Sequence, residues 1–118
     1  MRHGLRTEPN RWGWTETTLY AFNGNDGGQP NGGLVSDSEG NLYGTTAAGG
    51  EQYSGVVFKL TPEGKETVLH GFCWQDNCTD GQQPYAGLIF DQKGNLYGTT
   101  IYGGAGIYRG GVVFRLTP

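Results

Sequence analysis

The sequence is poor in charge and has no long hydrophobic run. Only 16% of its 118 residues are charged, with 8 Lys and Arg against 11 Asp and Glu, so the net charge at pH 7 is −3. Nucleic acids and anionic membrane surfaces are held by basic patches, and neither is therefore expected as a partner. No stretch approaches the roughly 18 apolar residues of a membrane span, and residues 1–14 lack the apolar core of a signal peptide.

Cysteine is also scarce. Cys73 and Cys78 are the only two, and both lie in one polar segment. This spacing favours a loop-closing disulfide formed in an oxidising compartment, which indicates an extracellular or cell-surface location. Two alternatives are a metal-binding pair, for which the chain offers no second pair of soft ligands, and two free thiols.

Glycine, by contrast, occupies 23 positions without the three-residue period of collagen. Such glycine is typical of many tight turns between short strands. The 5 Phe, 7 Tyr and 3 Trp supply aromatic bulk that a disordered segment would lack. We therefore predict a folded, all-β protein whose length suits one modest domain.

Three sequence stretches occur twice. They are GNLYGTT at 40–46 and 94–100, DGGQP at 26–30 with DGQQP at 80–84, and GVVFKLTP at 55–62 with GVVFRLTP at 111–118. The offset grows from 54 to 56 residues along the chain, because loop 101–110 has gained two residues relative to loop 47–54. Repeats of this period are typical of propeller blades.

Strand and turn signals alternate within each unit. The first unit predicts strands at 34–37, 42–46, 55–61 and 66–72, which together form a complete blade at about 34–72. Four antiparallel strands in about 50 residues are what one blade of a β-propeller needs.

The second unit is permuted. It predicts three strands, at 88–91, 96–100 and 111–117, and the sequence that matches the missing fourth is residues 16–22. We therefore predict an N-terminal tail at 1–14 and two propeller blades at 15–118, with 16–22 as the fourth strand of one blade and about 88–117 as strands 1 to 3 of the next.

Two blades are too few to close a propeller, which has roughly four to eight. Head-to-tail contacts between copies close into a ring where the rotation allows and otherwise extend as a filament. We predict self-association into a homotrimer with six blades first, a homotetramer with eight blades second and a filament third. In each, strand 16–22 of one chain is exchanged onto strand 111–117 of a neighbour. If the chain is instead a piece of a longer multi-blade protein, its flanks should still associate.

The strings GNLYGTT, GVVFKLTP and TVLHGF together resemble the repeat unit of the choice-of-anchor tandem repeat family of the Gloeobacter–Verrucomicrobia type. The resemblance covers residues 16–118. It implies a repeat-built, propeller-like bacterial protein that is secreted or held at the cell surface, with no assigned activity. No catalytic residue carries over from it.

The long loops are the predicted binding region. In a four-stranded blade the 2–3 loop and the 4–1 connection emerge on one face, and the tight turns emerge on the other. Loops held by a rigid scaffold commonly carry binding residues. Aromatic side chains in these loops suit the flat face of a carbohydrate ring, although packing between blades is the alternative role. The aromatic candidates are Trp74, Tyr85, Tyr53, Tyr102 and Tyr108, with Trp74 as the first choice.

Asp26 and Asp80 open the two matching Asp-Gly-X-Gln-Pro segments. Each carboxylate is a candidate for binding a cation or sugar hydroxyls. The alternative, which turn chemistry favours, is a side chain that caps the following turn. The spacing of a calcium loop is absent, so no metal is predicted.

The sequence shows no constellation for catalysis. His70 stands alone on its strand, and no two carboxylates are placed as the acid and base of a glycosidase. We therefore predict a non-enzymatic, lectin-like module without a cofactor, which binds a ligand such as a glycan through the long-loop face.

Two other functions remain open. The first is a purely structural ring or filament of a bacterial surface. The second is a hydrolase or lyase in the central channel, where Asp37 and Asp91 at the ends of the first strands would form a ring of carboxylates.

Overall fold

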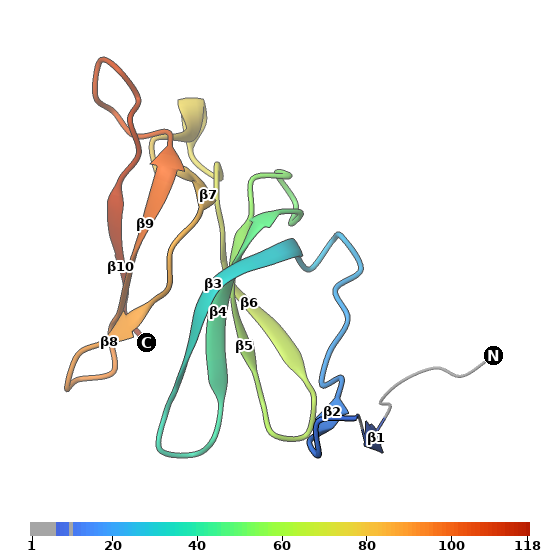
Figure 1. Ribbon diagram of the computed structural model, residues 1–118. Helices are drawn as coiled ribbons and strands as arrows, with labels where there is room; N and C mark the ends of the chain where they lie inside the picture. Colours follow the sequence, from blue (N-terminus) through green and yellow to red (C-terminus); the bar gives the residue numbers. More distant parts are fainter. Residues whose placement is uncertain (1–6, 10) are drawn as a thin grey trace.

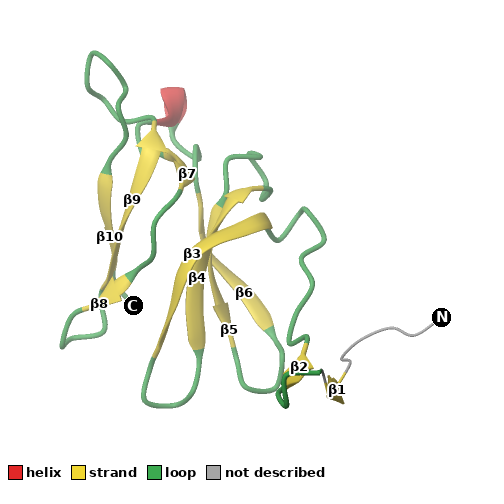
Figure 2. Cartoon of the chain, viewed as in Figure 1, coloured by secondary structure: helices red, strands yellow, loops and turns green. Residues whose placement is uncertain are grey.

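The computed structural model describes residues 7–9 and 11–118, so residues 1–6 and 10 of the predicted tail lie outside the described part. The described chain is all-β, as predicted, with one short 3-10 helix (Figure 2). Its elements are β1 (Thr7–Pro9), β2 (Thr15–Thr17), β3 (Gly28–Ser36), β4 (Leu42–Ala48), β5 (Val56–Leu60), β6 (Glu66–Gly71), η1 (Asp76–Cys78), β7 (Gln82–Pro84), β8 (Ile89–Phe90), β9 (Leu96–Tyr102) and β10 (Val113–Leu116).

Two four-stranded antiparallel sheets lie side by side (Figure 1). The first sheet has the order β3-β4-β5-β6. In the second sheet, β9 is central, with β10 along one edge and β7 and β8 along the other. β1 and β2 form a separate two-stranded ribbon at the end of the first sheet where its tight turns lie.

The opening strand of each unit differs from its prediction. β3 begins at Gly28 rather than at residue 34, and its register on β4 shifts between Asn31 and Val35. Turn-forming residues such as Pro30 predicted a loop there, but the pairing of this stretch with β4 overrides that local preference. In the second sheet the equivalent strand is divided into β7 and β8.

The tight turn before each repeated heptapeptide is organised by an aspartate. Asp37 accepts hydrogen bonds from the backbone N–H groups of Glu39 and Asn41 at 2.9 and 3.0 Å. It also accepts from Asn41 Nδ2 and from the Tyr43 hydroxyl, both at 2.9 Å. Asp91 repeats this network in the second unit. Hydrogen bonds to the charged form, chiefly from the asparagine side chain, lower the pKa of both aspartates to about 2.

The rest of the heptapeptide is a packing element. A Cβ on Gly44 would lie 2.8 Å from the Phe58 ring, so only glycine lets the ring cross the strand at this point. Thr46 Oγ1 donates to the Ala48 carbonyl at 2.9 Å and accepts from the Val56 N–H at 3.2 Å, which joins β4 to β5. Gly98 and Thr100 make the same contacts in the second sheet.

The main core lies between the two sheets. Val57 and Phe72 from the first sheet and its end pack with Leu88 and Leu96 from the second. Phe72 also meets Phe114 edge to face, with ring centroids 5.1 Å apart. Removing each of these side chains from water contributes on the order of 1.5–3 kcal/mol, so this junction holds the two sheets together.

The two ends of the molecule differ. Figure 1 shows the tight turns of both sheets at one end and the long loops at the other, as predicted. From β2 at the tight-turn end, the chain rises beside the first sheet to the long-loop end before it enters β3. The predicted strand at 16–22 is therefore wrong beyond residue 17, because β2 ends at Thr17 and pairs with β1, and residues 18–22 of this rising stretch lie outside the strands.

Candidate functional site

We compare the exposed faces of the two sheets with the junction between them, where the equivalent residues are buried. On the side of the first sheet, Val57 is 0% exposed, and on the side of the second sheet Leu88 is 3% exposed. One backbone hydrogen bond crosses it, from the Gln83 N–H to the Ser54 carbonyl at 2.8 Å. This junction is thus tightly packed and also hydrogen-bonded.

The outer face of the second sheet carries the counterparts of residues that the junction buries on the first sheet. We call this face, with Ile89, Thr99 and Val113, the β10 flank. Val113 is the counterpart of Val57 and is 80% exposed, and Ile89 on the same face is 64% exposed. Thr99 is exposed, whereas its counterpart Thr45 is buried and donates its hydroxyl to a carbonyl across the junction. The β10 flank is therefore an uncovered copy of a core-forming face.

The outer face of the first sheet carries the counterparts from the other side of the junction. We call this face, with Leu34, Leu42, Phe58 and Leu60, the groove flank. Leu34 is the counterpart of Leu88, yet it is 58% exposed. These residues line a groove of about 400 Å³ whose opposite wall is formed by residues 16–22.

We call residues 16–22 the N-terminal segment. This segment contacts the groove flank in the same way as Phe72, the residue after β6, contacts the second sheet. Phe22 meets Phe58 edge to face, with centroids 5.0 Å apart, which matches the pair of Phe72 and Phe114. The N-terminal segment therefore packs on the first sheet as Phe72 packs on the second.

A polar contact repeats the same correspondence. The Tyr20 hydroxyl donates to the Asp26 carboxylate, and its counterpart His70 lies with Nε2 3.1 Å from Asp80. The hydrogen bond to Asp26 is the main reason that the pKa of Tyr20 rises to about 12.

A second groove lies beside β10, along the edge that corresponds to the edge of β5 on which β6 pairs. It has a volume of about 300 Å³. Its lining includes His70, Phe72 and Asp80 on one side and Val113 and Phe114 on the other. Among the described residues, β10 pairs only with β9, so its outer edge has unpaired backbone groups.

Glu66 stands at the start of β6, on the side of the N-terminal segment. Its Oε2 is buried without a hydrogen-bond partner among the described residues. Burial, with a smaller contribution from the charge of Asp26, raises the pKa of Glu66 to about 7. Its counterpart in the repeat is the exposed Glu16.

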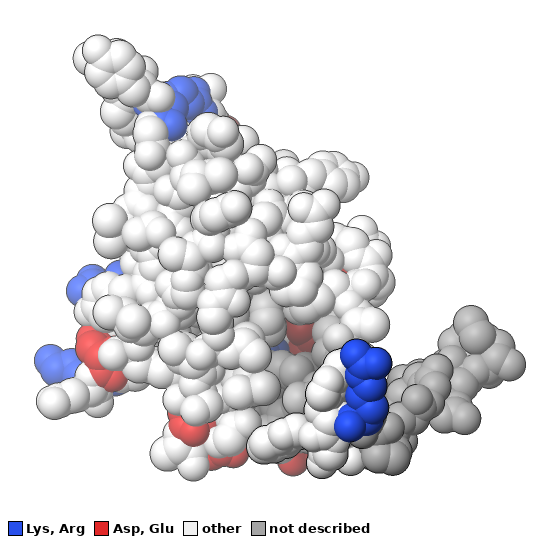
Figure 3. Space-filling view, viewed as in Figure 1, with Lys and Arg blue, Asp and Glu red and all other residues white. Residues whose placement is uncertain are grey.

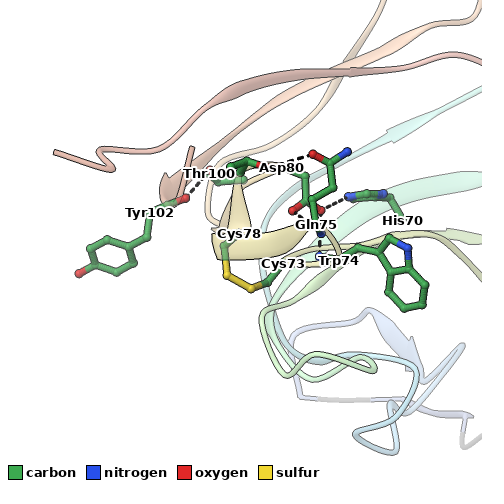
Figure 4. A network of polar contacts seen from close by, with 9 residues as sticks. His70, Cys73, Trp74, Gln75, Cys78, Asp80, Thr100 and Tyr102 are labelled. Atoms are coloured by element: carbon green, nitrogen blue, oxygen red, sulfur yellow. Dashed lines mark hydrogen bonds and ion pairs between the residues drawn. A yellow bond between two sulfur atoms is a disulfide. The ribbon is translucent and has the colours of Figure 1, made fainter. Parts of the chain in front are cut away.

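The long-loop end holds the cysteine pair. Cys73 and Cys78 form a disulfide pair, with Cα atoms 4.0 Å apart, which supports the disulfide prediction. Figure 4 shows the Asp80 carboxylate beside this pair, accepting hydrogen bonds from the Trp74 and Gln75 N–H groups at 3.0 and 3.1 Å.

The predicted role of the two aspartates as caps of the following turn needs correction. Asp80 holds residues 74–75, and Asp26 accepts from the Asn23 N–H at 2.9 Å, so both carboxylates organise the stretch before them. The physical reason is that the chain folds back between strands, which brings the earlier N–H groups within reach. Their predicted ligand contacts are untested.

The predicted aromatic residues are all exposed, but they do not form one cluster. Trp74 is 63% exposed and lines a shallow groove of about 130 Å³, together with Asn25, Glu51 and Gln52. The other four lie on loops and at strand ends outside this groove. They are Tyr53, Tyr85, Tyr102 and Tyr108.

Charge and metal ligands are sparse. The face seen in Figure 3 has few charged side chains between its two ends. Within residues 7–9 and 11–118, no group of three or more His, Cys, Asp or Glu is placed to hold a metal ion. In the same part of the chain, no helix has the length and apolar character to cross a membrane.

Two sequence-related antiparallel sheets, joined through one core, define an all-β repeat protein. The chain matches the family model of the Gloeobacter/Verrucomicrobia repeat over residues 6–118 and belongs to that family, which confirms the resemblance. No curated protein matches the chain.

Sequence reasoning missed the apolar residues of the two flanks. It predicted open flanks but did not name Leu34 or Val113, which the structure shows to be exposed there. The available signal was the permuted order of the units, which leaves one face of each without a neighbour.

Proposed function

We propose that this protein is a non-enzymatic repeat module that associates head to tail with copies of itself into a closed β-propeller and binds a ligand at its long-loop end. The observation that carries the proposal is the pair of flanks. Each face that packs inside the chain occurs a second time on the opposite side of the molecule, without a neighbouring sheet and with Leu34 or Val113 exposed. Each sheet is then one blade.

The β10 flank of one copy fits the groove flank of the next because both repeat the internal junction. Val113 would pack against Leu34 and Leu42, as Val57 does against Leu88 and Leu96. Leu34 and Val113 are 58% and 80% exposed in the single chain. Burying each would contribute on the order of 1.5–3 kcal/mol.

The backbone conformation at Gln29 also suits such a contact. Gln83 donates its N–H across the junction and has a φ of 56°, and its counterpart Gln29 has a φ of 53°. Positive φ is uncommon outside glycine, so its recurrence at Gln29 indicates the same role. The Gln29 N–H would then donate to the carbonyl of Gly110, the counterpart of Ser54, on the neighbouring copy.

Ring size follows from the repeat. Two blades per chain give six in a trimer and eight in a tetramer, both within the range of known propellers, and the trimer is the first expectation. A contact angle that does not close would give a filament. In each case the N-terminal segment of one copy completes the second blade of another.

The long-loop end is the proposed ligand face, with a glycan as the ligand. Trp74 offers an exposed indole face, and Asn25, Glu51 and Gln52 place hydrogen-bonding groups around the same groove. Aromatic faces flanked by such groups suit sugar rings, which have an apolar face and hydroxyl edges. A ring would present three or four copies together, and weak single sites then gain avidity.

A purely structural ring or filament is the second candidate. It is favoured by the loop aspartates, because Asp26 and Asp80 are both engaged in hydrogen bonds that hold their own loops. In that case the loops would need no ligand.

The test of assembly is the solution mass from light scattering on a sizing column at several protein concentrations. We expect a discrete trimer or tetramer. Leu34→Asp should shift it to a monomer, because the flank would have to bury an unpaired charge. A wild-type chain that stays monomeric at every concentration would overturn the proposal.

Ligand binding is tested separately on a glycan array. We expect saturable binding to at least one glycan that is lost in Trp74→Ala. Trp12→Ala is the matched control, because Trp12 is also exposed, at 68%, but belongs to the connection between β1 and β2, which lie at the tight-turn end (Figure 1). Absence of binding, or equal loss in both variants, would favour the purely structural candidate.

A further inference from the structure

We infer that the outer edge of β10 receives residues 16–22 of a second copy in one particular register, the register that β6 takes on β5. The occupant of the groove beside β10 is thus a named segment of the same sequence. This goes one step further than the proposed function, on which it rests, because it fixes which residues pair across the contact.

The first observation is the pairing inside the first sheet. β6 pairs antiparallel with β5, with Lys59 opposite Thr67 and a register shift between Val57 and Phe58. The repeat carries these strands over to β10 and to the N-terminal segment. The predicted pairs are Leu116 with Glu16, Arg115 with Thr17, Phe114 with Thr18, Val113 with Tyr20 and Val112 with Ala21.

The second observation is the placement of the N-terminal segment. Phe22 and Tyr20 already contact Phe58 and Asp26 as Phe72 and His70 contact their own partners. A copy that docks its β10 flank on the groove flank therefore brings β10 alongside this segment without a large rearrangement.

The third observation is the chemistry of the groove beside β10. In the first sheet, Glu66 lies close to both Tyr20 and Asp26. The charge of Glu66 helps to raise the pKa of Tyr20, and the charge of Asp26 helps to raise the pKa of Glu66. In the predicted register, Glu16 of the second copy takes this place beside His70 and Asp80. There His70 Nε2, 3.1 Å from the Asp80 carboxylate, stands in place of the Tyr20 hydroxyl.

The register also covers the exposed apolar surface. Tyr20 of the second copy would lie opposite Val113, which is 80% exposed in the single chain. The backbone groups along the outer edge of β10 would gain partners in the same step. Both changes favour pairing of the N-terminal segment of a second copy with β10 over a β10 edge that stays uncovered.

The test is disulfide trapping in the full chain under mild oxidation, with the linked peptides identified by mass spectrometry. Thr17→Cys with Arg115→Cys should link different copies, because paired residues in antiparallel strands lie within disulfide reach. Lys59→Cys with Thr67→Cys is the matched control, since it is the same pair inside one chain and should link without joining copies. Thr17→Cys with Val113→Cys is the out-of-register control and should link poorly.

β2 and β10 lie on opposite sides of the molecule, so a link within one chain does not imitate the expected result (Figure 1). Covalent trimers or tetramers on a non-reducing gel would support the register. An oligomer that forms by light scattering but links equally well through the out-of-register pair would overturn it and leave the proposed assembly intact. A chain that is monomeric by light scattering would overturn both.

If a cysteine variant fails to fold, hydrogen exchange of the wild-type chain decides the question. The amides of residues 16–22 and 113–116 should become protected as concentration drives association. Unchanged exchange in both segments while the oligomer forms would overturn the inference.

Discussion

The two sheets have nearly the same sequence motifs and opposite patterns of exposure. Val57 in the first sheet is fully buried and its counterpart Val113 in the second is 80% exposed, whereas Leu88 in the second is buried and Leu34 in the first is 58% exposed. The residue types do not account for this difference. It arises because each sheet has a neighbouring sheet on only one side. The same side chain is therefore in the core in one repeat unit and at the surface in the other.

The tight turns show the opposite behaviour. Asp37 and Asp91 make the same four hydrogen bonds in both sheets, with pKa values lowered alike to about 2. All of these partners lie within six residues along the chain. Local networks therefore repeat faithfully, and long-range packing does not.

The strongest test of this difference in burial is to make the same substitution at equivalent positions of the two sheets. Val57→Asp should abolish folding, because it buries an unpaired carboxylate at a cost above about 4 kcal/mol. Val113→Asp should change the unfolding free energy of the dilute monomer by less than about 0.5 kcal/mol and still prevent association. Urea unfolding at low concentration and light scattering at high concentration measure the two effects. Equal destabilisation by both variants would contradict the comparison.

A smaller effect is expected at the start of the fourth strands. The pKa of Glu66 is raised from 4.5 to about 7, so the folded state favours its protonated form. Its contribution is therefore present in full below about pH 4.5 and is lost as pH rises toward 7. The unfolding free energy of the dilute monomer should therefore fall between about pH 4.5 and 7, and Glu66→Gln should remove this fall.

The matched control is Glu16→Gln, because Glu16 is the exposed counterpart of Glu66. It should leave the pH dependence of the dilute monomer as it is in the wild type. Urea midpoints across this pH range give the comparison. A wild-type curve that stays flat, or one that both variants flatten, would exclude the burial of Glu66 as its cause.

The smallest effect should be equal in the two sheets. Because the pKa of Asp37 and of Asp91 is lowered from 3.8 to about 2, their stabilisation is present above about pH 3.8 and is lost as pH falls toward 2. Asp37→Asn and Asp91→Asn should each make acid unfolding shallower, by similar amounts, in far-UV circular dichroism. Clearly unequal slopes would show that one turn depends on its neighbours.

Much of the fold could be predicted from local signals. The strands β4, β5, β6 and β9, the tight turns and the separation of turns from long loops follow from alternation, glycine placement and the repeat. The start of β3 at Gly28 was not predicted, because Pro30 and Gly32 are turn residues and only pairing with β4 makes this stretch a strand. For the same reason, sequence alone did not show that Asp26 and Asp80 hold the stretch before them.

The sequence by itself determined the family, the two repeated units and the turn at each aspartate, because these depend on residues close together in the chain. Only the tertiary structure decided which copy of each apolar residue is covered. It also decided that residues 16–22 rest on the groove flank and that one carboxylate oxygen of Glu66 is buried. Burial is set by contacts between residues far apart in sequence, and the sequence of one chain does not specify which of two equivalent faces finds a neighbour.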